Sequence, residues 1–322
     1  MDKEHISPEL AFLKNIFVPD RWENYAKRMS ILSSDNPEDW RMIDFPVEIA
    51  LELTNYCNLR CVMCPSPSLR RSKGYMEEAV FQKVVKEIRG EKGFLFLPQG
   101  FGEPLLHKKW FELIDFASGF GISPIVVLSN GMLLDETNAH RLLDRVDVII
   151  VTIDGVTPKT YESIRVGGSL KTVTRNIQRF LEIRGPNGKP RLVLRIIRMQ
   201  DTEGEIAAFK DFWSSRISEG DIIQVAEYND WAGQVTYRGA AGTPTNRKRH
   251  PCRMLWKNLS VFHNGQVSPC CYDAEGELIV GNVLHQSLRE IWNGSHLKNI
   301  RDLHIAHQFE KIPICSRCRS WF

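Results

Sequence analysis

The sequence predicts an α/β fold: a partial (β/α)6 barrel of the TIM type, with a helical N-terminal extension and a small C-terminal β-hairpin-plus-helix domain. Two observations lead to this prediction. Six strand-like runs alternate with helical stretches after residue 46, and a strong hairpin signal follows residue 251. A complete eight-unit barrel takes about 250 residues, so six units in a shorter span indicate an open barrel. The expected domains are 1–45, 46–228 and 251–322, with 229–250 as a linker.

The N-terminal extension has apolar side chains at helical spacing. Leu13, Ile16 and Phe17 belong to one apolar stripe, and Tyr25 and Leu32 continue it. A stripe of this kind is buried when its helix packs against another element. We therefore expect helices that pack on the main domain, and no chemical motif is visible in them.

The barrel region is predicted from the periods of its apolar residues. Runs of apolar and β-branched residues bounded by turn residues are expected to be strands. These runs are 47–53, 93–97, 124–128, 146–153, 191–197 and 221–226. Between them, apolar residues at helical spacing predict helices around 80–88, 111–116, 142–143, 173–181 and 206–212. Strands that alternate with helices favour βαβ units and a parallel sheet.

The composition is that of an ordinary soluble protein. Of the 322 residues, 43% are hydrophobic and 25% are charged, with a formal net charge of +3. So small a charge does not indicate a nucleic-acid partner, and no apolar run approaches the ~20 residues needed to span a bilayer. The first residues are polar and lack the apolar core of a signal peptide. We therefore expect a cytoplasmic protein with neither nucleic acid nor membrane as its partner.

The eight cysteines fall into two groups, and the first lies at the end of the first predicted strand. Cys57, Cys61 and Cys64 have the spacing C-x3-C-x2-C. Three thiolates on one loop can hold three irons of a [4Fe–4S] cluster, which leaves the fourth iron open to a small molecule. Two alternatives remain on spacing alone: a zinc site with a fourth ligand from elsewhere, and three unrelated buried cysteines.

This motif directly after a first strand resembles the signature of radical S-adenosylmethionine (SAM) enzymes, whose fold is also a partial (β/α)6 barrel. The resemblance implies that Cys57, Cys61 and Cys64 hold the cluster and that its open iron binds SAM. An electron from a donor such as flavodoxin or ferredoxin would cleave SAM. The resulting 5′-deoxyadenosyl radical would take a hydrogen atom from a small-molecule or peptide substrate.

Active sites of such barrels lie at the C-terminal ends of the strands, where further residues resemble the family's SAM-binding motifs. Gly102-Glu103-Pro104 resembles a Gly-Gly-Glu-Pro motif, although Phe101 replaces its first glycine. Glycines there let the backbone approach a ligand closely. The resemblance implies SAM contacts from Gly102, Glu103, Ser129, Asn130, Thr152 and Asp154.

Arg195 is a cation in a strand expected to be buried on both faces. It either pairs with an acid such as Glu103 or Asp154, or meets the carboxylate of SAM or an anion of the substrate. We include it among the SAM-binding candidates. A general base or hydrogen donor cannot be named from the sequence; the candidates near strand ends are Tyr161, Arg195, Glu227 and Tyr228.

The second group of cysteines predicts a closed metal site. Asn264-Gly265 predicts a two-residue hairpin between strands at 259–263 and 266–270, with a further strand at 278–280 and a helix at 288–303. The expected ligands come from three places in this unit: Cys252, Cys270, Cys315 and Cys318. Zinc and iron–sulfur are both compatible with four thiolates. Cys271 should point away from Cys270 and is interpreted as a packing residue.

The spacing around Gly265 resembles the SPASM domain of radical SAM enzymes, in its shortened one-cluster form called twitch. The resemblance implies an auxiliary [4Fe–4S] cluster, hence two clusters and SAM as cofactors. A fully ligated cluster suits electron transfer, as in the cyclitol dehydrogenases that this layout resembles. We therefore expect oxidation of a small polar metabolite such as a sugar or cyclitol. The alternatives are a peptide maturase or epimerase, and a non-catalytic zinc or iron–sulfur protein.

Overall fold

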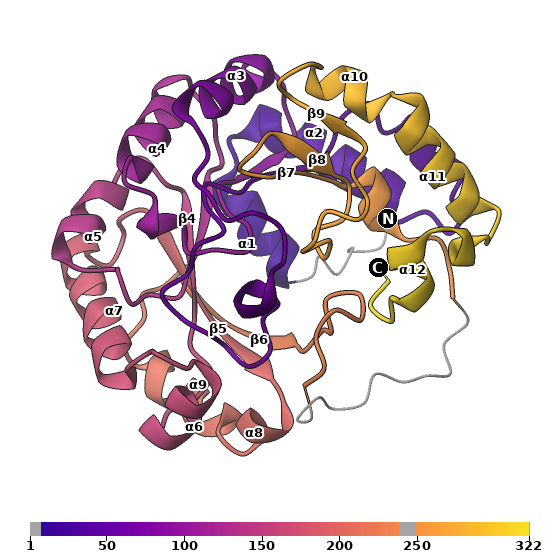
Figure 1. The fold of residues 1–322 in the computed structure, drawn as a ribbon. Coiled ribbons are helices and arrows are strands. Elements are labelled where there is room, and N and C mark those ends of the chain that lie inside the picture. Colours follow the sequence, from indigo (N-terminus) through magenta and orange to yellow (C-terminus); the bar gives the residue numbers. More distant parts are fainter. Residues whose placement is uncertain (1–7, 238–248, 322) are drawn as a thin grey trace, which may run out of the picture.

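The computed structural model describes residues 8–237 and 249–321 and shows an open barrel with helices around its outside (Figure 1). All six predicted strands are present, and consecutive strands are parallel neighbours. A single parallel bridge between Phe96 and Ile125 continues the order from the second strand to the third. The strands are β1 (Glu48–Leu51), β2 (Leu95–Leu97), β3 (Val126–Ser129), β4 (Val148–Thr152), β5 (Arg191–Arg198) and β6 (Ile222–Glu227). The predicted partial (β/α)6 barrel is confirmed.

Helices cover the outer face of the strands because one side of each is apolar. On α3 (Glu78–Ile88), for example, Phe81, Val84 and Ile88 are fully buried. The other predicted helices are α4 (Trp110–Gly119), α5 (Glu136–Leu142), α7 (Leu170–Arg184) and α9 (Ile206–Ser214). The sequence did not predict two short helices, α6 (Pro158–Ile164) and α8 (Gln200–Glu203). Their one or two turns are too short to show a helical period.

The N-terminal segment forms the expected helices, α1 (Pro8–Ile16) and α2 (Pro19–Leu32). Phe17, Tyr25 and Leu32 are buried against the barrel. Phe12 and Leu13 of α1 line a cavity inside the barrel, together with side chains of β2 to β6. The extension therefore closes the N-terminal end of the barrel.

The C-terminal unit joins the barrel sheet, which the sequence did not predict. Its first strand, β7 (Asn258–Val261), pairs in parallel with β1, so that Leu51 lies opposite Val261. The strands β8 (Gln266–Ser268) and β9 (Gly281–Asn282) continue the same sheet in antiparallel fashion. One hydrophobic core runs through both parts of the molecule. The C-terminal unit is thereby held at the open edge of the barrel.

Three details of this unit differ from the prediction. The hairpin loop has three residues: Phe262 pairs with Gln266, and only Gly265 has a positive φ, of 83°. A type I turn followed by a left-handed residue suits Asn-Gly as well as a type I′ turn does. The predicted strand at 278–280 ends just before β9 begins at Gly281. The amide of Val280 nevertheless donates to the carbonyl of Val267 at 2.8 Å. The predicted helix 288–303 is two helices, α10 (Leu288–Trp292) and α11 (Ser295–Ile305), separated at Asn293-Gly294.

The predicted linker 229–250 is described only in part. Arg247 and Lys248 lie outside the described residues, whereas Arg249 is partly buried. Its Nη2 donates to the carbonyl of Cys315 at 2.6 Å, and its guanidinium lies 4.3 Å from the ring centroid of Phe309. The last helix, α12 (Pro313–Arg317), carries Cys315.

A search of the described helices for a membrane span found none with the necessary length and apolar character.

Candidate functional site

The first group of cysteines lies on the cluster loop, which we define as residues 54–65 after β1. Each thiol meets an N–H donor. The amides of Leu59 and Ser66 donate to Cys57 Sγ at 3.5 Å and to Cys64 Sγ at 3.4 Å. The third donor is a cation, Arg165, whose Nη1 lies 3.5 Å from Cys61 Sγ. Such donors favour a thiolate over a thiol, and a thiolate is the form that binds iron.

The cluster loop is packed into an apolar and nearly dry environment. Burial raises the pKa of Cys57, and it raises the pKa of Cys64 to about 12. Burial thus opposes the N–H donors and disfavours the free thiolates, and a bound metal would replace the proton. The apolar neighbours are Leu59, Met63, Ile164 and Met199. Two backbone hydrogen bonds, Arg60 N–H to the carbonyl of Val166 and Val62 N–H to that of Ile164, hold the loop against the end of α6.

Asp154, predicted as a SAM contact, forms a buried ion pair. Its Oδ2 accepts from Arg165 Nε at 2.7 Å and from Nη2 at 2.5 Å, and its Oδ1 accepts from the amide of Ile197 at 2.8 Å. The side chain of Asp154 is fully buried. Its role in the structure is to aim Arg165 at Cys61. Sequence reasoning missed Arg165 as a site residue, because only the fold brings it to the cluster loop.

Glu103, Ser129 and Asn130 form a second polar group beside the cluster loop. The buried Glu103 accepts from Ser129 Oγ at 2.8 Å and from the amide of Asn130 at 2.8 Å. Burial raises the pKa of Glu103 to about 7, although these hydrogen bonds oppose the shift. Asn130 then reaches the loop itself, where its Nδ2 donates to Asn58 Oδ1 at 2.8 Å and lies 3.8 Å from Cys57 Sγ.

Gly102 is required by a close approach, but the approach is to the protein rather than to a ligand. A Cβ at this position would lie 2.3 Å from the carbonyl oxygen of Thr54 and 2.5 Å from that of Tyr56. The next amide, of Glu103, donates to the same Tyr56 carbonyl at 2.9 Å. Thr152 is half-buried at the end of β4 and lies opposite Arg195 in the strand register.

Two adjoining cavities occupy the barrel interior. The barrel cavity, of about 530 Å³, is lined mainly by inward side chains of β1 to β6. The mouth cavity, of about 400 Å³, lies at the C-terminal strand ends and is lined by Gly100-Phe101-Gly102, Trp231 and Tyr272, among others. Both are lined by Ala50, Gln99, Leu128, Arg195 and Cys271. Cavities of 300–1,000 Å³ are typical of small-molecule sites.

The wall of the mouth cavity connects the cluster loop with the C-terminal unit. Trp231 Nε1 donates to the carbonyl of Met63 at 2.9 Å. The Trp231 ring lies edge-on to Phe101 at 5.5 Å and to Tyr272 at 5.4 Å between centroids. Trp231 falls in the predicted linker, so the sequence offered no signal for it.

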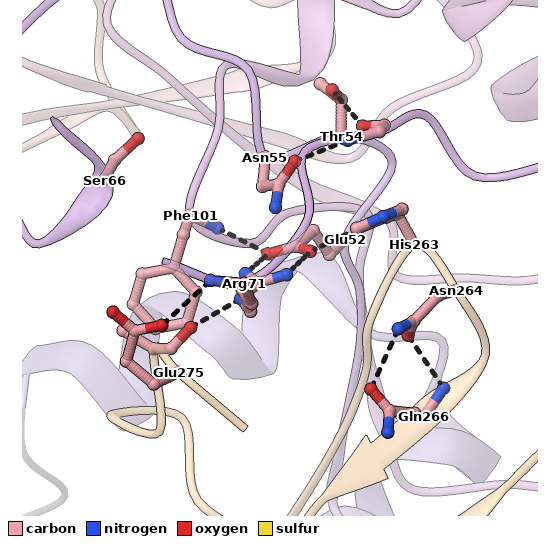
Figure 2. Close-up of polar contacts among 12 residues, drawn as sticks. Glu52, Thr54, Asn55, Ser66, Arg71, Phe101, His263, Asn264, Gln266 and Glu275 are labelled. Atoms are coloured by element: carbon pink, nitrogen blue, oxygen red, sulfur yellow. Dashed lines mark hydrogen bonds and ion pairs between the residues drawn. The ribbon is translucent and has the colours of Figure 1, made fainter. Parts of the chain in front are cut away.

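A buried ion network fixes the C-terminal hairpin to the same end of the barrel (Figure 2). Arg71 Nη1 donates to Glu52 Oε1 at 2.6 Å, and Nη2 donates to Oε2. His263 of the hairpin loop lies 3.2 Å from Glu52 Oε1. Burial works to raise the pKa of Glu52, but the hydrogen bonds from His263 and Arg71 outweigh it and lower the pKa to about 2. Arg71 Nε also donates to the carbonyl of Ala274 at 2.5 Å.

The second group of cysteines gathers around one pocket of the C-terminal unit. Cys252, Cys270, Cys315 and Cys318 all line it. His304, which sequence reasoning missed, lies among them: the Cys252 amide donates to its Nδ1 at 3.2 Å, and its Nε2 lies 3.4 Å from Cys315 Sγ. Nδ1 is thus the acceptor, and Nε2 carries the proton toward the sulfur. Cys271 lines the two barrel cavities instead, facing away from Cys270 as expected.

Among the residues that the structure describes, no three His, Cys, Asp or Glu side chains converge on a position for a single metal ion. An iron–sulfur cluster binds each thiolate to a different iron. Its cysteines therefore stand further apart than the ligands of one ion do. The arrangement of both cysteine groups is compatible with such clusters.

Comparison with known families identifies both parts of the chain. Residues 51–212 match the radical SAM superfamily, and residues 252–319 match the iron–sulfur cluster-binding domain SPASM. Among curated proteins, a probable GTP 3′,8-cyclase of Methanococcus maripaludis strain C5 is 29% identical over 180 residues, covering 55% of this chain and 57% of that protein. The mycofactocin maturase of Mycobacterium ulcerans is 31% identical over 138 residues, covering 42% and 37%. The matches thus span only part of these relatives.

Solved structures share the fold at low sequence identity. BtrN, crystallised with AdoMet and 2-DOIA, superimposes with a TM-score of 0.59 and 17% identity, covering 86% of this chain and 94% of BtrN. Streptococcus suis SuiB bound to the precursor peptide SuiA gives 0.66 and 14%, covering 87% and 71%. Identities this low show the fold alone.

The chain belongs to the radical SAM superfamily, because that family's match covers half of it. It is an enzyme with a C-terminal SPASM domain, and its cofactors are SAM and two [4Fe–4S] clusters.

Proposed function

We propose that this radical SAM enzyme oxidises a small polar metabolite, such as a sugar or cyclitol, in the mouth cavity between its two clusters. The observation that carries the proposal is the position of this cavity. Its wall residue Trp231 bonds to the cluster loop at Met63, and its wall residue Tyr272 also lines the pocket of the second cysteine group. A substrate there would lie beside both redox centres.

The cysteines of the two groups are the proposed cluster ligands. Cys57, Cys61 and Cys64 would hold the SAM-binding cluster, and Cys252, Cys270, Cys315 and Cys318 would hold the auxiliary cluster. When bound, these groups supply the family's chemistry: one-electron cleavage of SAM yields a 5′-deoxyadenosyl radical that takes a hydrogen atom, and the auxiliary cluster accepts an electron from the substrate. Oxidation of an alcohol carbon in this way also releases its hydroxyl proton.

The protein's own residues would orient SAM. Asn130 and Arg165 point at the cluster loop and are the proposed direct contacts; the cation Arg165 would bind the carboxylate of SAM. Glu103 and Asp154 are then positioning residues, since their oxygens already hold Ser129, Asn130 and Arg165. We assign Gly102, Ser129 and Thr152 to the surroundings of the SAM site. The location is proposed to be cytoplasmic, with flavodoxin or ferredoxin as electron donor.

A peptide maturase or epimerase is the second candidate function. It is supported by the mycofactocin maturase, 31% identical over 138 residues. The mouth cavity, of about 400 Å³, would then receive one residue of the peptide. The third expectation, a non-catalytic zinc or iron–sulfur protein, is set aside because the family match identifies an enzyme.

The test is formation of 5′-deoxyadenosine from SAM by anaerobically reconstituted protein with dithionite. We expect product from the wild type and from Cys271→Ser, whose thiol is not among the proposed cluster ligands, but none from Cys64→Ala. A metabolite or peptide that stimulates the reaction then identifies the substrate class. Oxidation gives a product two mass units lighter, whereas epimerisation in D₂O gives one that is a mass unit heavier. Iron-loaded wild type that forms no 5′-deoxyadenosine with any substrate would contradict the proposal.

A further inference from the structure

The acidic side chains around the two cavities already have partners. Glu52 is paired with Arg71, and Asp154 with Arg165. The remaining acids are Glu48, 2.7 Å from Lys257 Nζ; Glu227, 3.2 Å from Arg198 Nε; and Glu103, held by Ser129 and Asn130. The three carboxylates that line the two cavities, those of Glu48, Glu52 and Glu227, thus each have a cationic partner, and Glu103 lines neither cavity.

Arg195 is the cation without such a partner. Within residues 8–237 and 249–321, no carboxylate oxygen lies within 4.0 Å of its guanidinium, so the first of the two alternatives, pairing with Glu103 or Asp154, is excluded. Its Nε donates to Gln224 Oε1 of the neighbouring strand at 2.8 Å. This bond fixes the guanidinium and leaves the edge formed by Nη1 and Nη2 for another group. Arg195 lines both the barrel cavity and the mouth cavity.

Arg195 is half-buried, and a cation that has lost part of its hydration without gaining an anion is unfavourable. Burial accordingly lowers the pKa of Arg195, and nearby Asp154 opposes the shift only in part. A second polar group at the junction of the two cavities is also unsatisfied. The buried Gln99 Oε1 has no hydrogen-bond partner in the described chain. The guanidinium of Arg195 and Gln99 Oε1 are therefore both available to bind a polar ligand.

Arg195 and the cluster cysteines belong to different surroundings. Neither cavity that Arg195 lines includes Cys57, Cys61 or Cys64. The cation that reaches the cluster loop is Arg165, 3.5 Å from Cys61. Arg165 thus already supplies a cation at the cluster loop, which leaves Arg195 for the substrate.

We infer that the substrate carries an anionic group, a carboxylate or a phosphate, which Arg195 binds through Nη1 and Nη2 at the junction of the two cavities. This inference rests on the proposed function, because it assigns the anion to the substrate of the same site. Two parallel N–H donors match two oxygens of a carboxylate or phosphate. An unpaired hydroxyl or amine proton of the same substrate would satisfy Gln99 Oε1.

The test is calorimetric titration of the unreduced holoenzyme, in a zwitterionic buffer, with inorganic phosphate and separately with acetate. We expect saturable binding of at least one anion, and the preferred anion shows which acid the substrate carries. Arg195→Gln should weaken this binding at least tenfold, and Arg195→Lys should weaken it less. The matched control is Arg191→Gln on the same strand, whose Nη1 bonds to the carbonyl of Glu219 outside both cavities; it should leave the affinity within about twofold.

The affinity for SAM distinguishes an Arg195 that binds the substrate from an Arg195 that binds SAM. We expect the dissociation constant for SAM to change less than threefold in Arg195→Gln. A tenfold weaker SAM complex would overturn the inference, since Arg195 would then serve SAM. No saturable anion binding to the wild type, or equal anion binding by Arg195→Gln with its normal iron content, would also overturn it. Failure of the proposed function shows separately, as absence of 5′-deoxyadenosine from the wild type.

Discussion

The two groups of cysteines differ in how much of each site is left open. The cluster loop offers three thiols, and beside them lie the side chains of Asn130, which follows β3, and Arg165, which follows α6. The C-terminal pocket offers four thiols, with His304 as the neighbouring donor. Three ligands leave an iron free for chemistry, whereas four close the cluster and leave electron transfer as its role.

We expect the largest effect, on iron content and SAM cleavage, when one cysteine is removed from each group in turn. Cys61→Ala and Cys315→Ala should each lose about half of the bound iron, since each destroys one of two clusters. Only Cys61→Ala should lose SAM cleavage altogether, and Cys315→Ala should keep slow 5′-deoxyadenosine formation without substrate oxidation. Iron content and product are measured on the same samples. Equal loss of SAM cleavage in both variants would break the comparison.

The next largest effect concerns Arg165, the charged donor of the first site. Arg165→Met should slow SAM cleavage about 100-fold or more, as loss of a preorganised donor does in other active sites. It also leaves the fully buried Asp154 without its cation, so Arg165→Met/Asp154→Asn should recover stability without recovering activity. Arg179→Met, which changes an exposed arginine of α7, is the control. Activity within tenfold of the wild type would rule out Arg165 as a SAM contact.

The ion network in Figure 2 links the C-terminal hairpin to the barrel, and breaking it should destabilise the protein. Arg71→Met leaves the buried Glu52 without its arginine and with only His263 and the amide of Phe101 as partners, which costs about 3–5 kcal/mol of unfolding free energy. Glu52→Gln/Arg71→Met should regain part of that loss. The adjacent Arg70, whose side chain is 84% exposed, is the matched control, and Arg70→Met should change the free energy by less than about 1 kcal/mol. Urea denaturation measures all three, and equal stabilities would show that the network does not fasten the hairpin.

The smallest effect is a pH dependence confined to the first site. Glu103 has a pKa raised to about 7, so it is a carboxylate above pH 7 and takes up a proton below it. The protonated acid cannot accept from Ser129 and Asn130 equally well, and the hold on Asn130 weakens. SAM affinity should therefore fall about 3- to 10-fold from pH 8 to pH 6, the value of one hydrogen bond.

The same titration in two variants identifies the group responsible for that fall. Glu103→Gln should show little pH dependence, because the amide does not titrate in this range. Glu112→Gln on the exposed side of α4 should keep the wild-type slope. A Glu103→Gln enzyme with an unchanged slope would assign the pH dependence to another group.

Sequence patterns predicted the barrel strands well because each strand carries its own apolar run between turn residues. They failed where an element depends on contacts distant in sequence. The helix predicted over 288–303 keeps one apolar stripe, but Asn293-Gly294 breaks it into two. No sequence pattern pointed to Trp231 or His304, because their partners Met63 and Cys315 lie more than 10 residues away along the chain.

The sequence by itself determined the fold class, the family and the two sets of cysteines, because apolar periods and the spacing of cysteines within short segments are local properties of the chain. Only the tertiary structure decided what the polar residues do. Glu103 and Asp154 have the identities expected of ligand contacts, yet their oxygens are occupied by Asn130 and Arg165. Arg195 has the identity expected of an ion pair, yet among the described residues no carboxylate oxygen lies within 4.0 Å of its guanidinium. Charge partners are set by distance in space, and a linear pattern does not contain that distance.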